Sequence, residues 1–226
     1  MNTTDAPDPA LLASLATLHT DPARVGPPAL ARRQQRCGDT IRITAAATQS
    51  VPEGDAVLVR DGRATRLETW PSGDAVRAGD VLVLAVDATD AARQRFVAWL
   101  SAGTLPEGCA VAPCSRADGA LHRLWCVAAA RIALPTTISV QARHDLLGIR
   151  LAQLALAMGA DTLAGPLQDN RVLPLAGVPR PTETTADGLA ALVRHAGCTP
   201  HSDPSPPGEA SARRASAAPS SRPSPA

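Results

Sequence analysis

The sequence predicts an α/β protein with a β-rich N-terminal half and a disordered C-terminal tail. In the second half, helical and strand-like segments alternate, which is typical of a parallel sheet covered by helices. The first half contains a strong hairpin pattern around Asp61–Gly62. From Pro200 onward the chain consists mostly of Pro, Ser, Ala and Arg, and such a segment buries too little apolar surface to offset its conformational entropy.

Length and composition exclude several classes of protein. The 226 residues fit one domain with tails, and 45% hydrophobic residues suffice for a core. A net charge of +1 and only 2% aromatic residues argue against nucleic-acid binding. No apolar run is long enough to span a membrane, and no signal peptide is evident. The five cysteines are an odd, widely spaced set, which argues against a disulfide framework and favours the cytoplasm.

In the first half, the pattern predicts three helices and four strands. The expected helices cover 10–20, 29–37 and 90–103. The second follows helix-starting pairs at Asp21–Pro22 and Pro27–Pro28 and ends at Gly38. The third is expected to point Phe96, Val97 and Leu100 inward. The expected strands cover 40–44, the two arms of a hairpin within 55–70, and 78–89.

The second half begins after a predicted loop at 104–120, which is rich in Pro, Gly and Cys. Next we expect a helix over 121–133 that ends before Pro135, followed by a strand over 136–142. A helix over 144–158 should end at Gly159 and be followed by a short strand, and a last helix should cover 185–196. The chain therefore divides into a disordered lead (1–9), entry helices with a β-rich segment (10–103), the loop (104–120), helix–strand units (121–199) and a disordered tail (200–226).

Four segments resemble one family, the radical-SAM enzymes of the futalosine route to menaquinone (aminofutalosine synthase and cyclic dehypoxanthine futalosine synthase). The segments are DPARVGPPALARRQQRCGDTIRIT (21–44), RLWCVAAARIALPTTISVQA (123–142), LGIRLAQLALAMGADTLAGPL (147–167) and TADGLAALVRHAGCTP (185–200). The resemblance implies a (β/α) barrel and a link to menaquinone biosynthesis.

The middle of the chain departs from this family. Its members hold a [4Fe–4S] cluster with a Cys-x3-Cys-x2-Cys loop just after the first strand, and one iron of that cluster binds S-adenosylmethionine. Here AAATQSVPEGDAV (45–57) follows the strand and contains no cysteine. The resemblance therefore implies a partial or degenerate barrel, and a non-catalytic homologue that acts as a binding or partner protein.

Two groups of residues are candidates for ligand binding. Arg143, His144 and Asp145 lie where a strand meets a helix, the edge at which α/β barrels place function. The alternatives are that Asp145 caps the helix and that His144 is a solvated first-turn residue. Asp161 matches the Gly-Ala-Asp position of the family, where a carboxylate could bind substrate or simply serve the turn after Gly159.

A third candidate is a metal or redox site made of Cys109, Cys114, Cys126 and His122. The cysteine spacing fits neither a radical-SAM loop nor a zinc ribbon, and Cys126 has an alternative role as a small apolar residue in a helix. We therefore expect no cofactor. If these four residues do form a site, it would hold an iron–sulfur cluster or zinc.

These observations lead to three functional hypotheses. The first is the degenerate, non-catalytic homologue, and the others are an enzyme or ligand-binding protein with a His/Asp cleft and a small cysteine-based metal or redox protein. Because a partial barrel leaves strand edges unpaired, we expect a homodimer or a complex with a full-length barrel enzyme.

Overall fold

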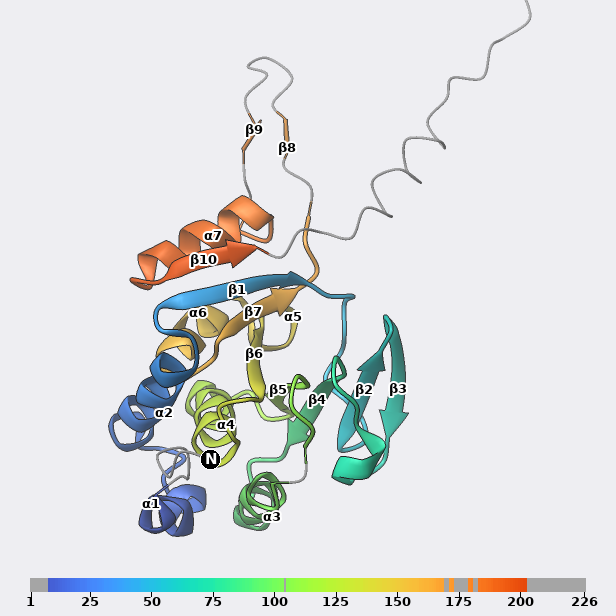
Figure 1. Cartoon of the computed structure of the whole chain (residues 1–226), viewed down its shortest axis with the longest axis vertical. Coiled ribbons are helices and arrows are strands. Elements are labelled where there is room, and N and C mark those ends of the chain that lie inside the picture. Colours follow the sequence, from blue (N-terminus) through green and yellow to red (C-terminus); the bar gives the residue numbers. More distant parts are fainter. Residues whose placement is uncertain (1–7, 104, 169–170, 173–178, 181–182, 203–226) are drawn as a thin grey trace, which may run out of the picture.

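A computed structural model describes residues 8–103, 105–168, 171–172, 179–180 and 183–202 (Figure 1). The predicted lead and tail therefore lie largely outside the described residues. Among the described residues, no helix has the length and apolar character needed to cross a membrane.

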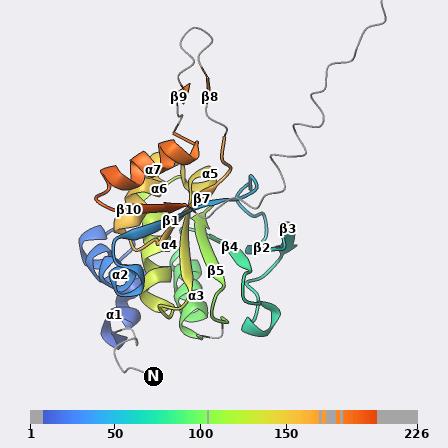
Figure 2. The same ribbon diagram turned by 45° about the horizontal axis from the view of Figure 1, so that its top comes forward.

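The centre of the fold is an open, mostly parallel sheet (Figures 1 and 2). Its strand order is β10-β1-β7-β6-β5-β4-β2-β3, in which the strands from β10 to β4 are parallel and the last two pairings are antiparallel. The bounds are Thr40–Ala45 (β1), Ala56–Arg60 (β2), Arg63–Leu67 (β3), Val81–Val86 (β4), Ala110–Ser115 (β5), Ser139–Arg143 (β6), Thr162–Gly165 (β7) and Thr199–Ser202 (β10). A separate antiparallel pair joins Arg171–Val172 (β8) and Pro179–Arg180 (β9). The α/β class is confirmed, and the sheet does not close into a barrel.

The helices lie mainly against one face of this sheet (Figure 2). They are Pro9–Ser14 (α1), Pro22–Cys37 (α2), Asp90–Ser101 (α3), Ala120–Ala133 (α4), His144–Leu147 (α5), Ile149–Ala157 (α6) and Ala186–His195 (α7), with short 3-10 turns at Leu15–Thr17 and Gly73–Ala75. Phe96, Val97 and Leu100 of α3 are buried as predicted, and α7 buries Leu189 and Val193.

Strand alternation divides the apolar residues between the two faces of the sheet. In β4, Leu82 and Leu84 join the large core shared with the helices, whereas Val83 joins a smaller cluster with Cys114 and Leu146. The smaller cluster lies on the face opposite most of the helices, which α5 reaches through Leu146, and this face also carries the candidate site.

The hairpin prediction is confirmed in detail. β2 and β3 pair from Ala56–Leu67 to Arg60–Arg63, so a two-residue loop connects them. Asp61 and Gly62 both have positive φ angles, 50° and 74°, which is the backbone that a type I′ turn requires.

The predicted loop over 104–120 was wrong, because it contains strand β5. All residues of Ala110–Ser115 are buried, and the strand pairs with both β4 and β6. The sequence did not indicate this strand because it contains Pro113 and mostly small residues instead of β-branched ones. A strand between two parallel neighbours must be buried, but it need not be rich in β-branched side chains.

Three boundaries also differ from the prediction. Helix α2 begins at Pro22, with Asp21 as its N-cap, and runs through Pro27 and Pro28. The helix expected over 144–158 is interrupted at Gly148, which has a φ of 81°. Residues 200–202, assigned to the tail, belong to β10, which pairs with β1.

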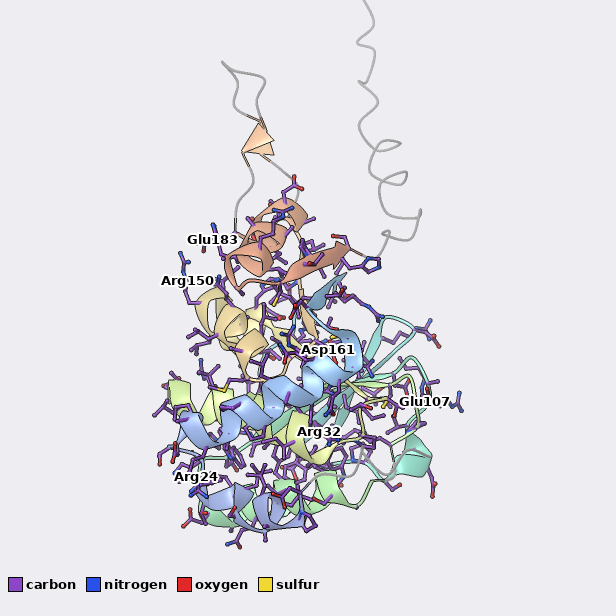
Figure 3. The ribbon with its side chains drawn as sticks, turned by 60° about the vertical axis from the view of Figure 1, so that its left-hand side comes forward. Arg24, Arg32, Glu107, Arg150, Asp161 and Glu183 are labelled. Atoms are coloured by element: carbon purple, nitrogen blue, oxygen red, sulfur yellow. The ribbon has the colours of Figure 1, made fainter. Side chains whose placement is uncertain are left out.

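The turn that leads into β7 joins three elements through one buried carboxylate. Asp161 Oδ2 accepts hydrogen bonds from Arg131 Nη2 of α4 at 2.9 Å and from the Val140 N–H of β6 at 3.2 Å, and lies 3.0 Å from Arg36 Nε of α2. Its Oδ1 accepts from the Ser139 and Thr162 hydroxyls. Figure 3 shows Asp161 beside α2. All of its acceptor positions are therefore used within the protein.

Gly159 allows this arrangement because it has a φ of 92° and no side chain. A Cβ atom there would lie 2.6 Å from Arg131 Cγ and 2.9 Å from the Ala29 carbonyl oxygen. Gly159 thus lets α6 end directly against the arginine that pairs with Asp161.

We predict that Gly159→Ala lowers the free energy of unfolding by about 3 kcal/mol, because it combines a left-handed backbone with overpacking. Gly62→Ala is the matched control, since Gly62 also has a positive φ but a Cβ there would meet open space. That variant should lose only about 1 kcal/mol. Urea denaturation of both variants makes the comparison, and equal losses would contradict the close-packing argument.

Candidate functional site

The candidate site is a cavity of about 370 Å³ on the face of the sheet opposite the helices. The sheet curls, so that residues after β1, residues of β6 and the β2–β3 turn line the same space. The lining residues are Thr44, Ala45, Ala46, Ala47, Gln49, Val59, Asp61, Gly62, Gly79, Val81, Gln141 and Arg143. Gln141 and Arg143 share this face because they are two residues apart in a strand.

Arg143, which lines the cavity, belongs to a buried ion pair. Arg143 Nε donates to Asp145 Oδ1 at 2.9 Å and Arg143 Nη2 donates to Asp145 Oδ2 at 2.6 Å. The two side chains are only 3% and 7% exposed. Burial would raise the pKa of Asp145, but the hydrogen bonds from Arg143 and from the Gln49 N–H outweigh it and hold that pKa below its usual range. Asp145 is therefore an ionised partner of Arg143 and is poorly suited to act as a general base.

The same pair holds the segment that follows β1. Arg143 Nη2 donates to the Ala47 carbonyl at 2.6 Å, and the Gln49 N–H donates to Asp145 Oδ2 at 3.0 Å. The sequence predicted that Asp145 caps the following helix or faces a ligand. Instead, its carboxylate anchors residues 47–49 across the end of the sheet.

Three polar groups around the cavity have no hydrogen-bond partner among the described residues. They are the Thr44 hydroxyl, the Gln141 side-chain amide and Nη1 of Arg143, and the Thr44 oxygen is fully buried. Gln141 is itself only 7% exposed. Gln141 and Arg143 line the cavity, so their unpaired groups are available to a polar ligand, whereas the Thr44 oxygen is shielded from it.

His144 does not join this site, although the sequence grouped it with Arg143 and Asp145. Its ring packs against β7, where a Cβ on Gly165 would lie 2.4 Å from His144 Nε2. That nitrogen is buried without a partner, and burial lowers the pKa of His144. The imidazole is thus neutral near pH 7 and does not line the cavity.

Asp161 also lies apart from Arg143 and Asp145. Asp161 comes just before β7 begins, whereas Arg143 and Asp145 come at and after the end of β6. Because β6 and β7 are parallel, the two carboxylates lie at opposite ends of these strands. Its five internal contacts favour the structural interpretation of the Gly-Ala-Asp turn.

The cysteine candidates are distributed through the fold. Cys114 belongs to the small apolar cluster, while Cys126 belongs to the helix-side core, with its Sγ 3.9 Å from His122 Nε2. Burial raises the pKa of Cys109 to about 11 and that of Cys114 to about 12, which disfavours the thiolate. Over the part of the chain that the structure describes, no three or more His, Cys, Asp or Glu side chains form a group able to hold a metal ion.

Sequence reasoning missed Thr44, Gln49 and Gln141. A polar residue inside a strand expected to be buried, such as Gln141, is the signal that could have identified the cavity face. Gln49 had no such signal, because its place depends on where the chain turns after β1.

Comparison with known proteins adds no relative: no family model matches the chain, and no curated protein does.

Two buried histidines predict a loss of stability in mild acid. Burial lowers the pKa of His122 and of His144. Below the unfolded value of about 6.5, the unfolded chain therefore takes up protons before the folded chain does. The free energy of unfolding should fall as the pH drops below 6.5, by up to about 1.4 kcal/mol per pH unit for each histidine.

Replacing His122 by Phe should flatten this dependence, because the ring that stacks on Trp125 is kept and the titration is removed. Chemical denaturation between pH 5 and 8 gives the slope. His195→Asn, at an exposed position of α7, serves as the control. If both variants keep the full slope, His122 is not its source.

Proposed function

We propose that this chain is a non-catalytic binding protein, a degenerate relative of the radical-SAM enzymes of the futalosine route, and that its cavity holds a neutral, nucleoside-like ligand. By descent the protein is tied to menaquinone biosynthesis. All five cysteines are free, which fits a reducing compartment, and we propose the cytoplasm as its location.

The strand order supports a partial barrel as the origin of the fold. The two resembling regions are far apart in sequence, yet β1 from the front and β7 from the rear pair in parallel from Arg42–Thr162 to Ala45–Gly165. In a closed barrel the first and last strands are also neighbours. The β2–β3 hairpin would then stand where further strand–helix units have been lost.

The segment after β1 is the observation that carries the proposal. In the family this position holds the cluster-binding cysteines, whereas here it contains none and is bound to the Arg143–Asp145 pair. A loop fixed in this way contributes to the wall of a cavity and supplies no thiolate.

The polar groups of the cavity define the class of ligand. The Arg143–Asp145 pair is neutral as a whole, and solvent screens the other charged lining residue, the exposed Asp61, so the cavity favours a ligand without net charge. Gln141 offers an amide donor and acceptor side by side, the pattern that pairs with a nucleobase edge. A volume of about 370 Å³ suits a small molecule.

The other two hypotheses find less support in this arrangement. An enzyme with a His/Asp cleft would need a free base, but Asp145 is paired and His144 packs against Gly165. A cysteine-based metal protein would need Cys114 and Cys126 in one group, and they belong to separate apolar clusters.

The test is titration calorimetry with purine and pyrimidine nucleosides. We expect one of these nucleosides to bind, and Gln141→Leu to weaken binding about tenfold or more because a paired amide is lost. Gln94→Leu, at an exposed position on α3, is the matched control. Absence of binding by every nucleoside would reject the ligand class.

Anaerobic purification with iron and sulfide analysis tests the non-catalytic part separately. We expect no bound cluster. About four irons per chain would overturn the proposal, because cysteines elsewhere in the chain would then rebuild a cluster.

A homodimer or a complex with a full-length barrel would use the outer edge of β3. Four of its five residues are exposed, and its free edge can accept another strand. Arg63 opposes self-association there by charge, whereas Arg66 is already paired with Glu53 and Glu68. Light scattering after size-exclusion chromatography should detect a dimer if the homodimer forms, and a monomer leaves only the heterologous complex.

A further inference from the structure

A second cavity, of about 560 Å³, lies at the end of the sheet where the parallel strands begin. The end of α2 and the residues just before β5, β6 and β7 contribute to its wall. The lining residues are Gln35, Arg36, Cys37, Thr40, Arg42, Glu107, Gly108, Thr136, Thr137, Ser139, Asp161, Thr162 and His201. None of these residues lines the first cavity.

Arg36 and Arg42 line this cavity together with the carboxylates of Asp161 and Glu107, and the buried Arg131 lies behind Asp161. Arg36 and Arg131 both contact the same oxygen of Asp161, at 3.0 and 2.9 Å, so one carboxylate faces two guanidinium groups. The Arg131 side chain is fully buried, whereas that of Arg36 is 23% exposed. Arg36 also donates to the Thr136 carbonyl through Nη1, and its Nη2 has no partner among the described residues.

Three threonine residues line the same cavity as this guanidinium. Thr40, Thr136 and Thr137 line the cavity, and none of their hydroxyls forms a hydrogen bond to another described residue. Hydroxyl and guanidinium donors together are the usual ligands of phosphate oxygens. Glu107 is the opposing charge, but it is exposed, so solvent screens it.

We propose that this cavity binds a tetrahedral oxyanion, either free phosphate or a phosphate monoester, through Arg36 and the surrounding threonine hydroxyls. A bound oxyanion would offset the charge that Asp161 leaves unbalanced. The proposal is independent of the nucleoside-like ligand, because the two cavities share no residue.

Cys37 provides a direct readout, because it lines this cavity and is half-buried. Cys198 is the other partly accessible thiol, and the remaining three are buried. In the full-length Cys198→Ser protein, the rate of Cys37 alkylation by iodoacetamide can be followed by mass spectrometry. We expect inorganic phosphate or glycerol phosphate to slow it several-fold, relative to sodium chloride at equal ionic strength.

The two anions distinguish the source. Stronger protection by inorganic phosphate assigns free phosphate, and stronger protection by glycerol phosphate assigns a monoester. Equal alkylation rates in phosphate, glycerol phosphate and chloride would overturn the proposal, and this comparison does not depend on any change at Arg36.

Arg36→Gln tests the residue itself and should raise the concentration needed for half-protection about tenfold or more. Arg150→Gln is the matched control, because Arg150 is exposed on α6 and pairs with Glu183 (Figure 3). If Arg36→Gln fails to fold, Thr137→Val replaces it, since Thr137 is exposed and its hydroxyl has no structural partner. Unchanged protection in a folded variant would remove that residue from the site.

Discussion

The buried carboxylate of Asp161 is the interaction on which the helix–sheet packing depends. It binds Arg131 of α4, lies against Arg36 of α2 and accepts from the backbone of β6, so one side chain fixes two helices against the sheet. Burial lowers the pKa of Arg131 to about 10, and Asp161 opposes this shift, so the arginine stays charged at neutral pH. A buried charge that lost its partner would be strongly destabilising, which explains why α6 ends at a glycine that leaves room for this pair.

Much of the fold could be predicted from the sequence, because local chemistry determines it. Asp61–Gly62 specifies its hairpin by backbone preference alone, and apolar spacing identifies α3, α4 and α7. Strand β5 could not be found in this way. Its residues are small, and one is a proline, so only the strands on either side define it.

The candidate site was less predictable, for a related reason. The sequence placed Arg143 at a strand end, as the structure does, but it could not show that Asp145 would turn back to bind it, nor that His144 would face Gly165. Residues 44–49 reach the site only because the sheet curls. Such neighbourhoods depend on long-range geometry, which periodicity does not contain.

The place of β1 between β7 and β10 has a consequence for synthesis of the chain. Arg42 pairs with Thr162 on one side and with His201 on the other, so β1 leaves the ribosome about 120 residues before its first partner strand. At ordinary translation rates this delay is on the order of ten seconds. Throughout it, a strand with alternating Ile41 and Ile43 has no sheet to join. Folding of the centre must therefore wait for the C-terminal third, and nascent chains are most open to chaperones and to misassociation during that interval.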